Sequence, residues 1–166
     1  DLFNLGAGND TLVVDFATTI VAGPSANTPT LIGVENVTFK TAGSAIDMRN
    51  ADQKAALTFE GGGGAANTIS AIGLASGSTV TSTKAAASTV NVAFRDSVMG
   101  EKSTIDLQKG ATSVTVTNIK DATINYGATS TGVIALDDNT AGGAVATSEV
   151  TTALTINQTA GTMSAA

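Results

Sequence analysis

The sequence predicts an all-β protein built as a β-solenoid, that is, a β-helix-like stack of short strands. Three observations support this prediction. Short apolar–polar–apolar units recur at steps of roughly ten residues, and this alternation puts both apolar side chains on one face of a strand. Turn-forming Gly, Ser, Asn and Asp separate the units. The apolar residues are mostly small aliphatics, with only 4% aromatic residues, and small aliphatics suit stacked ladders inside a narrow coil.

The central residue of most units is Thr, Asn or Asp, and we expect it to face solvent. In chain order the units are Val37–Phe39, Ile46–Met48, Leu57–Phe59, Val90–Val92, Ile105–Leu107, Val114–Val116, Ile124–Tyr126 and Leu154–Ile156. Weaker copies near Ile69, Val80 and Val133 fill the larger gaps. The few aromatic residues are spread along the chain, and we expect them in the core. A β-sandwich is the alternative fold, because the steps between units are irregular.

Helix signals are poor along the whole chain. No long apolar stretch repeats at three- and four-residue spacing, and Gly, Thr and Val are scattered through every window. The one candidate is Ala45–Ala56, a segment long enough for one or two helical turns.

The composition argues against several classes of function. His and Cys are absent, which removes the commonest general base and the thiolate nucleophile, so we expect no enzymatic activity. A carbohydrate-active β-helix enzyme would need clustered carboxylates and exposed aromatics, and the sequence shows neither clearly. The net charge of −6 disfavours nucleic acid and anionic membrane surfaces as partners. No run of 18 apolar residues occurs, so no transmembrane segment is expected.

The opening of the chain carries the one motif with defined chemistry. Gly6, Gly8, Asp10 and Leu12 occupy positions two, four, six and eight of the calcium-binding nonapeptide G-G-x-G-x-D-x-U-x. Leu5 replaces the first glycine of that pattern. The glycines allow a tight turn with inward carbonyl groups, and the aspartate adds an anionic oxygen, both of which Ca²⁺ favours.

A partial second repeat precedes this one. Asp1 lies nine residues before Asp10, and Phe3 lies nine residues before Leu12, as expected for the end of a preceding nonapeptide. We therefore predict a calcium site that a neighbouring turn of the stack completes. Its predicted ligands in this chain are Asp1, Gly6, Gly8 and Asp10. The alternative interpretation is a glycine turn between two strands, without a metal.

Two segments resemble a known family. Asp1–Val13 resembles an RTX (repeats-in-toxin) repeat, and Leu31–Phe39 (LIGVENVTF) resembles a phrase that follows such repeats in RTX-type bacterial S-layer proteins and related giant surface proteins. The rest of the chain is similar in composition and rhythm only, with Thr/Ala/Gly-rich strand ladders. The resemblance implies type I secretion through a C-terminal signal, calcium-dependent folding outside the cell, and assembly into a lattice.

We accordingly expect residues 1–14 to end an RTX-like calcium-binding region and residues 15–166 to form a solenoid-like structural region of a longer chain. The expected function is that of an extracellular structural protein on the bacterial cell surface. It would self-assemble, with calcium, into an S-layer lattice or a filament. Any anchor to cell-surface polysaccharide is expected in another part of the parent chain. The alternative is an adhesin stalk or passenger module that binds a host or matrix partner.

Overall fold

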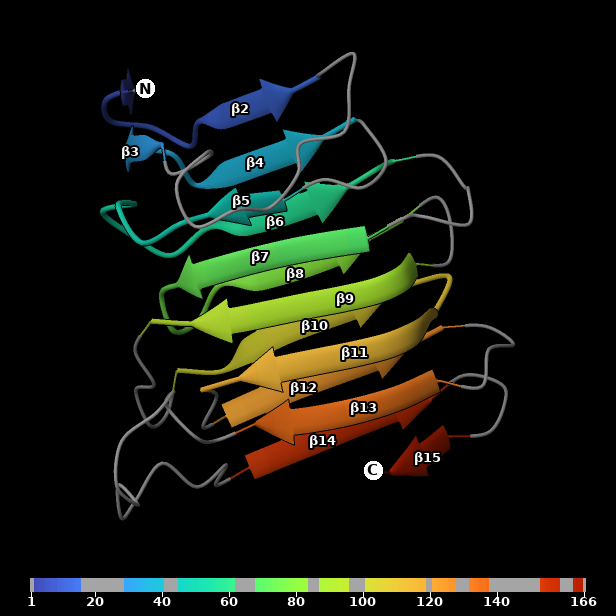
Figure 1. Ribbon diagram of the computed structural model, residues 1–166. Helices are drawn as coiled ribbons and strands as arrows, with labels where there is room; N and C mark the ends of the chain where they lie inside the picture. The colour runs from blue at the N-terminus through green and yellow to red at the C-terminus, as the bar shows by residue number, and fades with distance from the viewer. Residues whose placement is uncertain are drawn as a thin grey trace.

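The fold is a β-solenoid whose strands alternate between two facing sheets (Figure 1). The computed structural model describes residues 2–15, 29–40, 45–61, 68–83, 87–95, 101–118, 121–127, 132–137, 153–158 and 163–165. Every strand pair in these ranges is parallel, and none of these residues is helical. The solenoid prediction is therefore confirmed, and the alternative of a sandwich, whose hairpins and Greek keys pair antiparallel, is excluded.

The strands are short, and their bounds follow the sequence units closely. They are β1 Leu2–Asn4, β2 Thr11–Val14, β3 Thr30–Ile32, β4 Asn36–Phe39, β5 Ala45–Asp47, β6 Ala56–Phe59, β7 Thr68–Leu74, β8 Thr79–Ser82, β9 Ala87–Phe94, β10 Ser103–Leu107, β11 Ala111–Thr117, β12 Asp121–Tyr126, β13 Gly132–Asp137, β14 Ala153–Gln158 and β15 Met163–Ala165.

Even-numbered strands form a seven-stranded sheet in the order β14-β12-β10-β8-β6-β4-β2, and odd-numbered strands form a six-stranded sheet in the order β15-β13-β11-β9-β7-β5. β1 and β3 make a separate two-stranded sheet near the N-terminus. We call one strand of the larger sheet together with the next strand of the smaller sheet a coil. Each coil, for example β6–β7, stacks directly on the coils before and after it.

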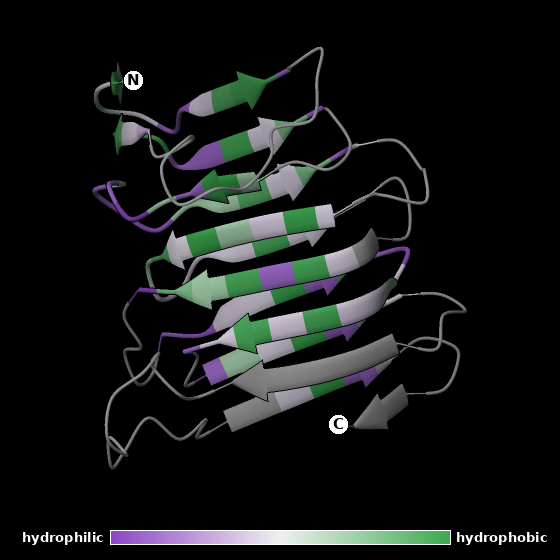
Figure 2. Ribbon diagram, viewed as in Figure 1, coloured by the Kyte–Doolittle hydropathy of each residue, from purple (hydrophilic) through white to green (hydrophobic). Residues whose placement is uncertain are grey.

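Strand register aligns the apolar residues into ladders through the interior. The longest ladder runs through the seven-stranded sheet, one residue per strand: Leu12, Val37, Leu57, Val80, Ile105, Ile124 and Ile156. Its five middle members are fully buried, whereas Leu12 is partly buried and Ile156 is 37% exposed. Figure 2 shows the resulting green bands crossing successive strands. The core is therefore one continuous column with its most exposed members at the two ends.

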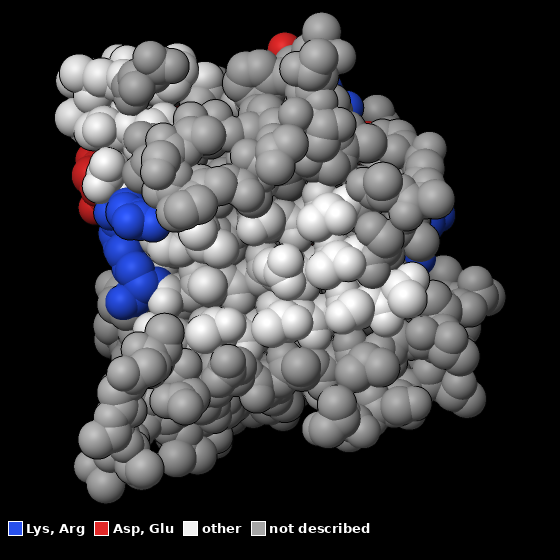
Figure 3. Space-filling model, viewed as in Figure 1, with Lys and Arg blue, Asp and Glu red and all other residues white. Residues whose placement is uncertain are grey.

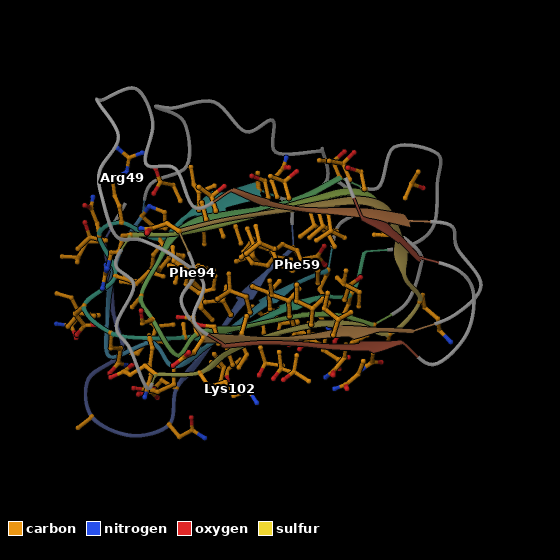
Figure 4. The ribbon with its side chains drawn as sticks, turned by 90° about the horizontal axis from the view of Figure 1, so that it is seen from below. Arg49, Phe59, Phe94 and Lys102 are labelled. Atoms are coloured by element: carbon orange, nitrogen blue, oxygen red, sulfur yellow. The ribbon has the colours of Figure 1, made fainter. Side chains whose placement is uncertain are left out.

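Aromatic side chains fill the space between the sheets. The rings of Phe39 and Phe59, from adjacent coils, stack with their centroids 4.6 Å apart and an interplanar angle of 9°. Figure 4 shows Phe59 and Phe94 between the two sheets, with Arg49 and Lys102 outside them. The prediction that aromatic residues belong to the core thus holds for Phe39, Phe59 and Phe94, which are all buried.

The prediction of one or two helical turns within Ala45–Ala56 is wrong. Its first residues form β5, a turn follows, and Ala51 makes an isolated parallel bridge with Leu31 before β6 begins at Ala56. The apolar residues of this segment belong to the strand ladder, because Ile46 pairs with Ala71 of the next coil. Tertiary pairing therefore decides the local structure here, over a weak helix propensity.

The outer faces of the sheets are mostly uncharged. On the face shown in Figure 3, the described Lys, Arg, Asp and Glu lie at the edges of the molecule, where the turns are. Outward strand positions hold Thr, Ser and Asn, such as Thr58 in β6 and Thr115 in β11. Within the described ranges, no helix is long and apolar enough to cross a membrane.

Candidate metal centre

The glycine turn at the start of the chain connects β1 to β2. Gly6 has a φ of +90°, a conformation that glycine adopts at little cost, and its N–H donates to the Asn4 side-chain oxygen at 3.2 Å. The turn ends at Asp10, directly before β2. The local sequence therefore explains this turn without any contribution from a metal.

The segment Leu31–Phe39, here called the second motif, lies directly against the glycine turn. β3 pairs with β1, and β4 pairs with β2, so the residues between β3 and β4 stack on the glycine turn. At this point Gly33, with a φ of +61°, has its Cα against the Gly6 carbonyl oxygen. A Cβ at position 33 would lie only 2.0 Å from that oxygen, so only glycine fits.

Glu35 in the second motif holds the end of the turn. Its Oε2 accepts a hydrogen bond from the main-chain N–H of Asp10 at 2.7 Å, and its Oε1 accepts one from the Gln53 amide of the next coil. The hydrogen bond from Asp10 is the main cause that lowers the pKa of Glu35, and the one from Gln53 adds to it. Glu35 therefore stays ionised and links three successive coils.

Asp10 is also held through its carbonyl group. The Asn36 side-chain nitrogen donates to the Asp10 carbonyl oxygen at 3.1 Å and to Asn9 Oδ1 at 2.8 Å. The Asn36 main-chain N–H donates to the same Asp10 carbonyl at 3.0 Å, as part of the β2–β4 ladder. Glu35 and Asn36 of the second motif thus fix the position of Asp10 with three hydrogen bonds to its main chain.

The Asp10 carboxylate itself has an unmatched oxygen. Oδ2 is buried from solvent, and no hydrogen-bond donor from the described part of the chain reaches it. A Cβ at position 8 would lie 3.3 Å from this oxygen, so glycine at position 8 leaves the space beside it open. A buried anionic oxygen without a donor is costly, and a cation would offset that cost. Asp10 and Gly8 therefore fit the Ca²⁺ chemistry that the sequence predicts.

The predicted ligands divide into three groups. Asp10 and Gly8 lie together in the turn. The Gly6 carbonyl points along the stack towards Gly33, and Asp1 lies outside the described residues. Among the residues described, no three Asp or Glu side chains gather closely enough to hold a metal alone. A site here would need main-chain oxygens beside the single carboxylate of Asp10.

Sequence reasoning missed the part that Glu35 plays. The residue lies in the phrase Leu31–Phe39, which stands out by resemblance and not by chemistry. Aligning Leu12 with Val37 as equivalent apolar positions would have placed Asp10 beside Glu35, and the observed register pairs Leu12 with Val37. This alignment of apolar positions is the feature of the sequence that could have identified Glu35 as the partner of Asp10.

The chain was compared with protein-family models, with curated proteins and with solved structures. It matches none of them significantly. The function of the chain is therefore inferred from the geometry of the turn and of the stack.

Proposed function

We propose that this chain is a structural, non-catalytic segment of an RTX-type protein on the bacterial cell surface, and that it self-assembles into an S-layer lattice or an extracellular filament. Calcium bound at the Gly6–Asp10 turn orders the start of the stack, at β1 and β2. The observation that carries the proposal is the buried, unmatched Oδ2 of Asp10 in a turn that a neighbouring coil stacks upon.

The shape of the molecule supports a structural role. Parallel coils stack in one direction, and strand pairing among the described residues joins each coil only to its neighbours. Among the described residues, β2 and β14 are the outermost strands of the seven-stranded sheet, and strands in that position present N–H and C=O groups that a further strand can pair with. Val13 on the outward face of β2 is 56% exposed, so this face also offers an apolar contact. Such surfaces favour association between copies.

The charge distribution supports calcium-assisted contacts. The chain carries a net charge of −6, and copies of like charge repel one another. Ca²⁺ outside the cell screens or bridges carboxylates, and the mostly uncharged outer faces leave little other repulsion. Secretion and surface location follow from the resemblance of Asp1–Val13 and Leu31–Phe39 to RTX-type surface proteins.

Assembly is tested by electron microscopy and light scattering of the purified protein with millimolar calcium and with a chelator. We expect sheets or filaments with calcium and smaller species after chelation. A protein that stays monomeric at high concentration in calcium would contradict self-assembly, and the adhesin function would then replace it.

Calcium binding is tested separately by calorimetry on the wild-type protein and on Asp10→Asn. We expect the substitution to remove one bound ion, because it takes away the one carboxylate that the described residues bring to the site. Asp106→Asn is the matched control, since Asp106 lies in β10 on the outward face and undergoes the same change in charge. Equal stoichiometry in wild type and Asp10→Asn would show that the motif is only a turn.

A further inference from the structure

A second turn, linked to the Asp10 turn through Glu35 and Gln53, gathers main-chain oxygens around a cation. The turn Met48–Ala51 follows β5. The carbonyl oxygens of Met48, Arg49 and Ala51 accept hydrogen bonds from one nitrogen, Nη1 of Arg95, at 3.3, 3.0 and 2.7 Å. We call these three oxygens the carbonyl cluster.

The hydrogen bonds within the turn explain why these carbonyls converge. Asp47 Oδ1 accepts the main-chain N–H of Arg49 at 3.0 Å, and the Ala51 N–H donates to the Met48 carbonyl at 3.0 Å. The remaining carbonyl, that of Asn50, accepts from Leu31 N–H of the preceding coil at 3.3 Å. The carbonyl oxygens of Met48, Arg49 and Ala51 therefore face the next coils of the stack, and Arg95 donates to all three.

Arg95 joins three consecutive coils. It directly follows β9, and its main-chain N–H donates to the Leu74 carbonyl of the intermediate coil at 2.8 Å. Its side chain then passes that coil to reach the carbonyl cluster. The intermediate coil has Gly73 at this place, with a φ of +68° and its Cα so near the turn that a Cβ would lie 2.7 Å from Arg49 N. A side chain at position 73 would therefore push the turn away from Arg95.

We infer that the turn Met48–Ala51 is a cation-binding site built from main-chain carbonyl oxygens, and that its ligand is the guanidinium group of Arg95. Carbonyl oxygens are ligands that hard cations such as Ca²⁺ also take, and a guanidinium offers five N–H donors in a planar fork. Arg95 thus supplies the positive charge and the N–H donors that these converging carbonyl oxygens attract. The inference does not rest on the proposed function.

The test follows hydrogen exchange at the Ala51 and Asp52 amides, which the closed turn protects through bonds to Met48 and Leu31. Arg95→Met keeps the aliphatic stem and removes the donors. We expect these amides to exchange about tenfold faster in that variant, because Arg95 is exposed and water replaces part of the lost bonding. Lys54→Ala is the control, since Lys54 is exposed in the same segment and its nearest acidic partner is Glu101 at 3.9 Å.

A rescue experiment on Arg95→Met tests whether a guanidinium group is the ligand of the turn. Methylguanidinium chloride, added to Arg95→Met well below denaturing concentration, should restore protection at both amides, whereas sodium chloride at the same concentration should not. Equal effects of the two salts, or unchanged exchange in Arg95→Met, would overturn the inference.

Two further measurements use the wild-type protein, so they do not require that the variant folds. The Nη1 protons of Arg95 should be resolved in NMR spectra and should exchange slowly. Chelation of calcium should leave Ala51 and Asp52 protected, even where it exposes the Gly6–Asp10 turn. Averaged, freely rotating Nη signals would contradict the inference, and so would loss of protection at Ala51 and Asp52 on chelation.

Discussion

Asp47 shows how one residue type at the centre of a strand unit can have two different environments. The sequence predicts solvent-facing side chains at these centres, and Asp106 in β10 is partly exposed. Asp47 is instead only 7% exposed, so the prediction is wrong there. Its Oδ2 lies 2.5 Å from the Arg49 guanidinium, and this contact raises the pKa of Arg49. A buried carboxylate needs such a partner, because burial without one is costly.

Glu35 gives a prediction about pH. Its pKa is lowered from its ordinary value of 4.5, mainly by the hydrogen bond from Asp10 N–H, so its contribution to stability is complete above pH 4.5. That contribution disappears as the pH falls through the lowered pKa of the folded state. We therefore expect Glu35→Gln to have a lower urea midpoint than wild type at pH 7, and the difference should shrink in acid below pH 4.5.

The control for this experiment is Glu101→Gln, because the Glu101 side chain is 47% exposed and its contact with Lys54 is long, at 3.9 Å. We expect little change in its urea midpoint at either pH. A difference between Glu35→Gln and wild type that stays constant down to strongly acidic pH would show that the Glu35 charge does not stabilise the turn.

Gly33 gives a prediction about packing between coils. Gly33→Ala should destabilise the protein by more than about 2 kcal/mol, because a positive φ costs a β-carbon about 1–2 kcal/mol and the Gly6 carbonyl would clash as well. Gly6→Ala is the matched comparison, since Gly6 also has a positive φ but open space around its Cβ position. Gly6→Ala should lower the free energy of unfolding only by the cost of the positive φ. Equal losses in chemical denaturation would mean that the Gly33 contact contributes nothing.

At the scale of one element, the strands of this protein contribute to stability mainly through their inward faces. Val37 and Phe39 of β4, like Leu57 and Phe59 of β6, are buried, while the threonine between each pair is only partly buried. Strands of four residues bury too little to be stable alone. Stacking two or more such strands turns isolated apolar residues into a continuous ladder.

Leu57 lies in the middle of that ladder and tests its importance. Leu57→Ala should lower the free energy of unfolding by about 2–5 kcal/mol, because the parallel strands on both sides prevent the cavity from closing. Thr58→Ala, at the next residue on the outer face, should change it by no more than about 0.5 kcal/mol. Urea denaturation of both variants measures this contrast. Similar losses would mean that the inward and outward faces are not energetically distinct.

At the scale of the whole molecule, the solenoid is close to one-dimensional. Each interior coil has neighbours on both sides, whereas β2 and β14 have a strand partner on only one side within the described chain. The inward ladder residues agree with this difference, because Leu12 of β2 is only partly buried and Ile156 of β14 is 37% exposed. Stability in such a stack is a sum of coil and neighbour terms, so it should vary along the chain.

Hydrogen exchange followed by mass spectrometry measures this variation. We expect amides of β8 and β10 to exchange most slowly and those of β2 and β14 to exchange fastest, because opening an interior strand breaks two ladders. Calcium should slow exchange in β2 and leave β14 unchanged, since Asp10 lies next to β2. Uniform protection along the chain would instead indicate a single cooperative unit.

The all-β class, the strand positions and the inward faces could be predicted from the sequence. Period-two alternation is a local property, and each predicted unit from Val37–Phe39 to Leu154–Ile156 contributes to a strand. The glycine turn before Asp10 was also predictable, because Gly6 and Gly8 stand at the positions that such a turn requires. These features depend on neighbouring residues only.

Register and long-range partners were decided by the tertiary structure. The intervals between stacked residues vary, from 19 residues between Asp106 and Asn125 to 32 between Asn125 and Asn157, so the sequence has no fixed period from which to count. Only stacking brings Glu35 to Asp10, 25 residues away, and Arg95 to Ala51, 44 residues away. The buried environment of Asp47 has the same origin. Which residue of the next coil a side chain contacts depends on the length of the loop between the two strands. The apolar–polar alternation within each strand carries no information about that length.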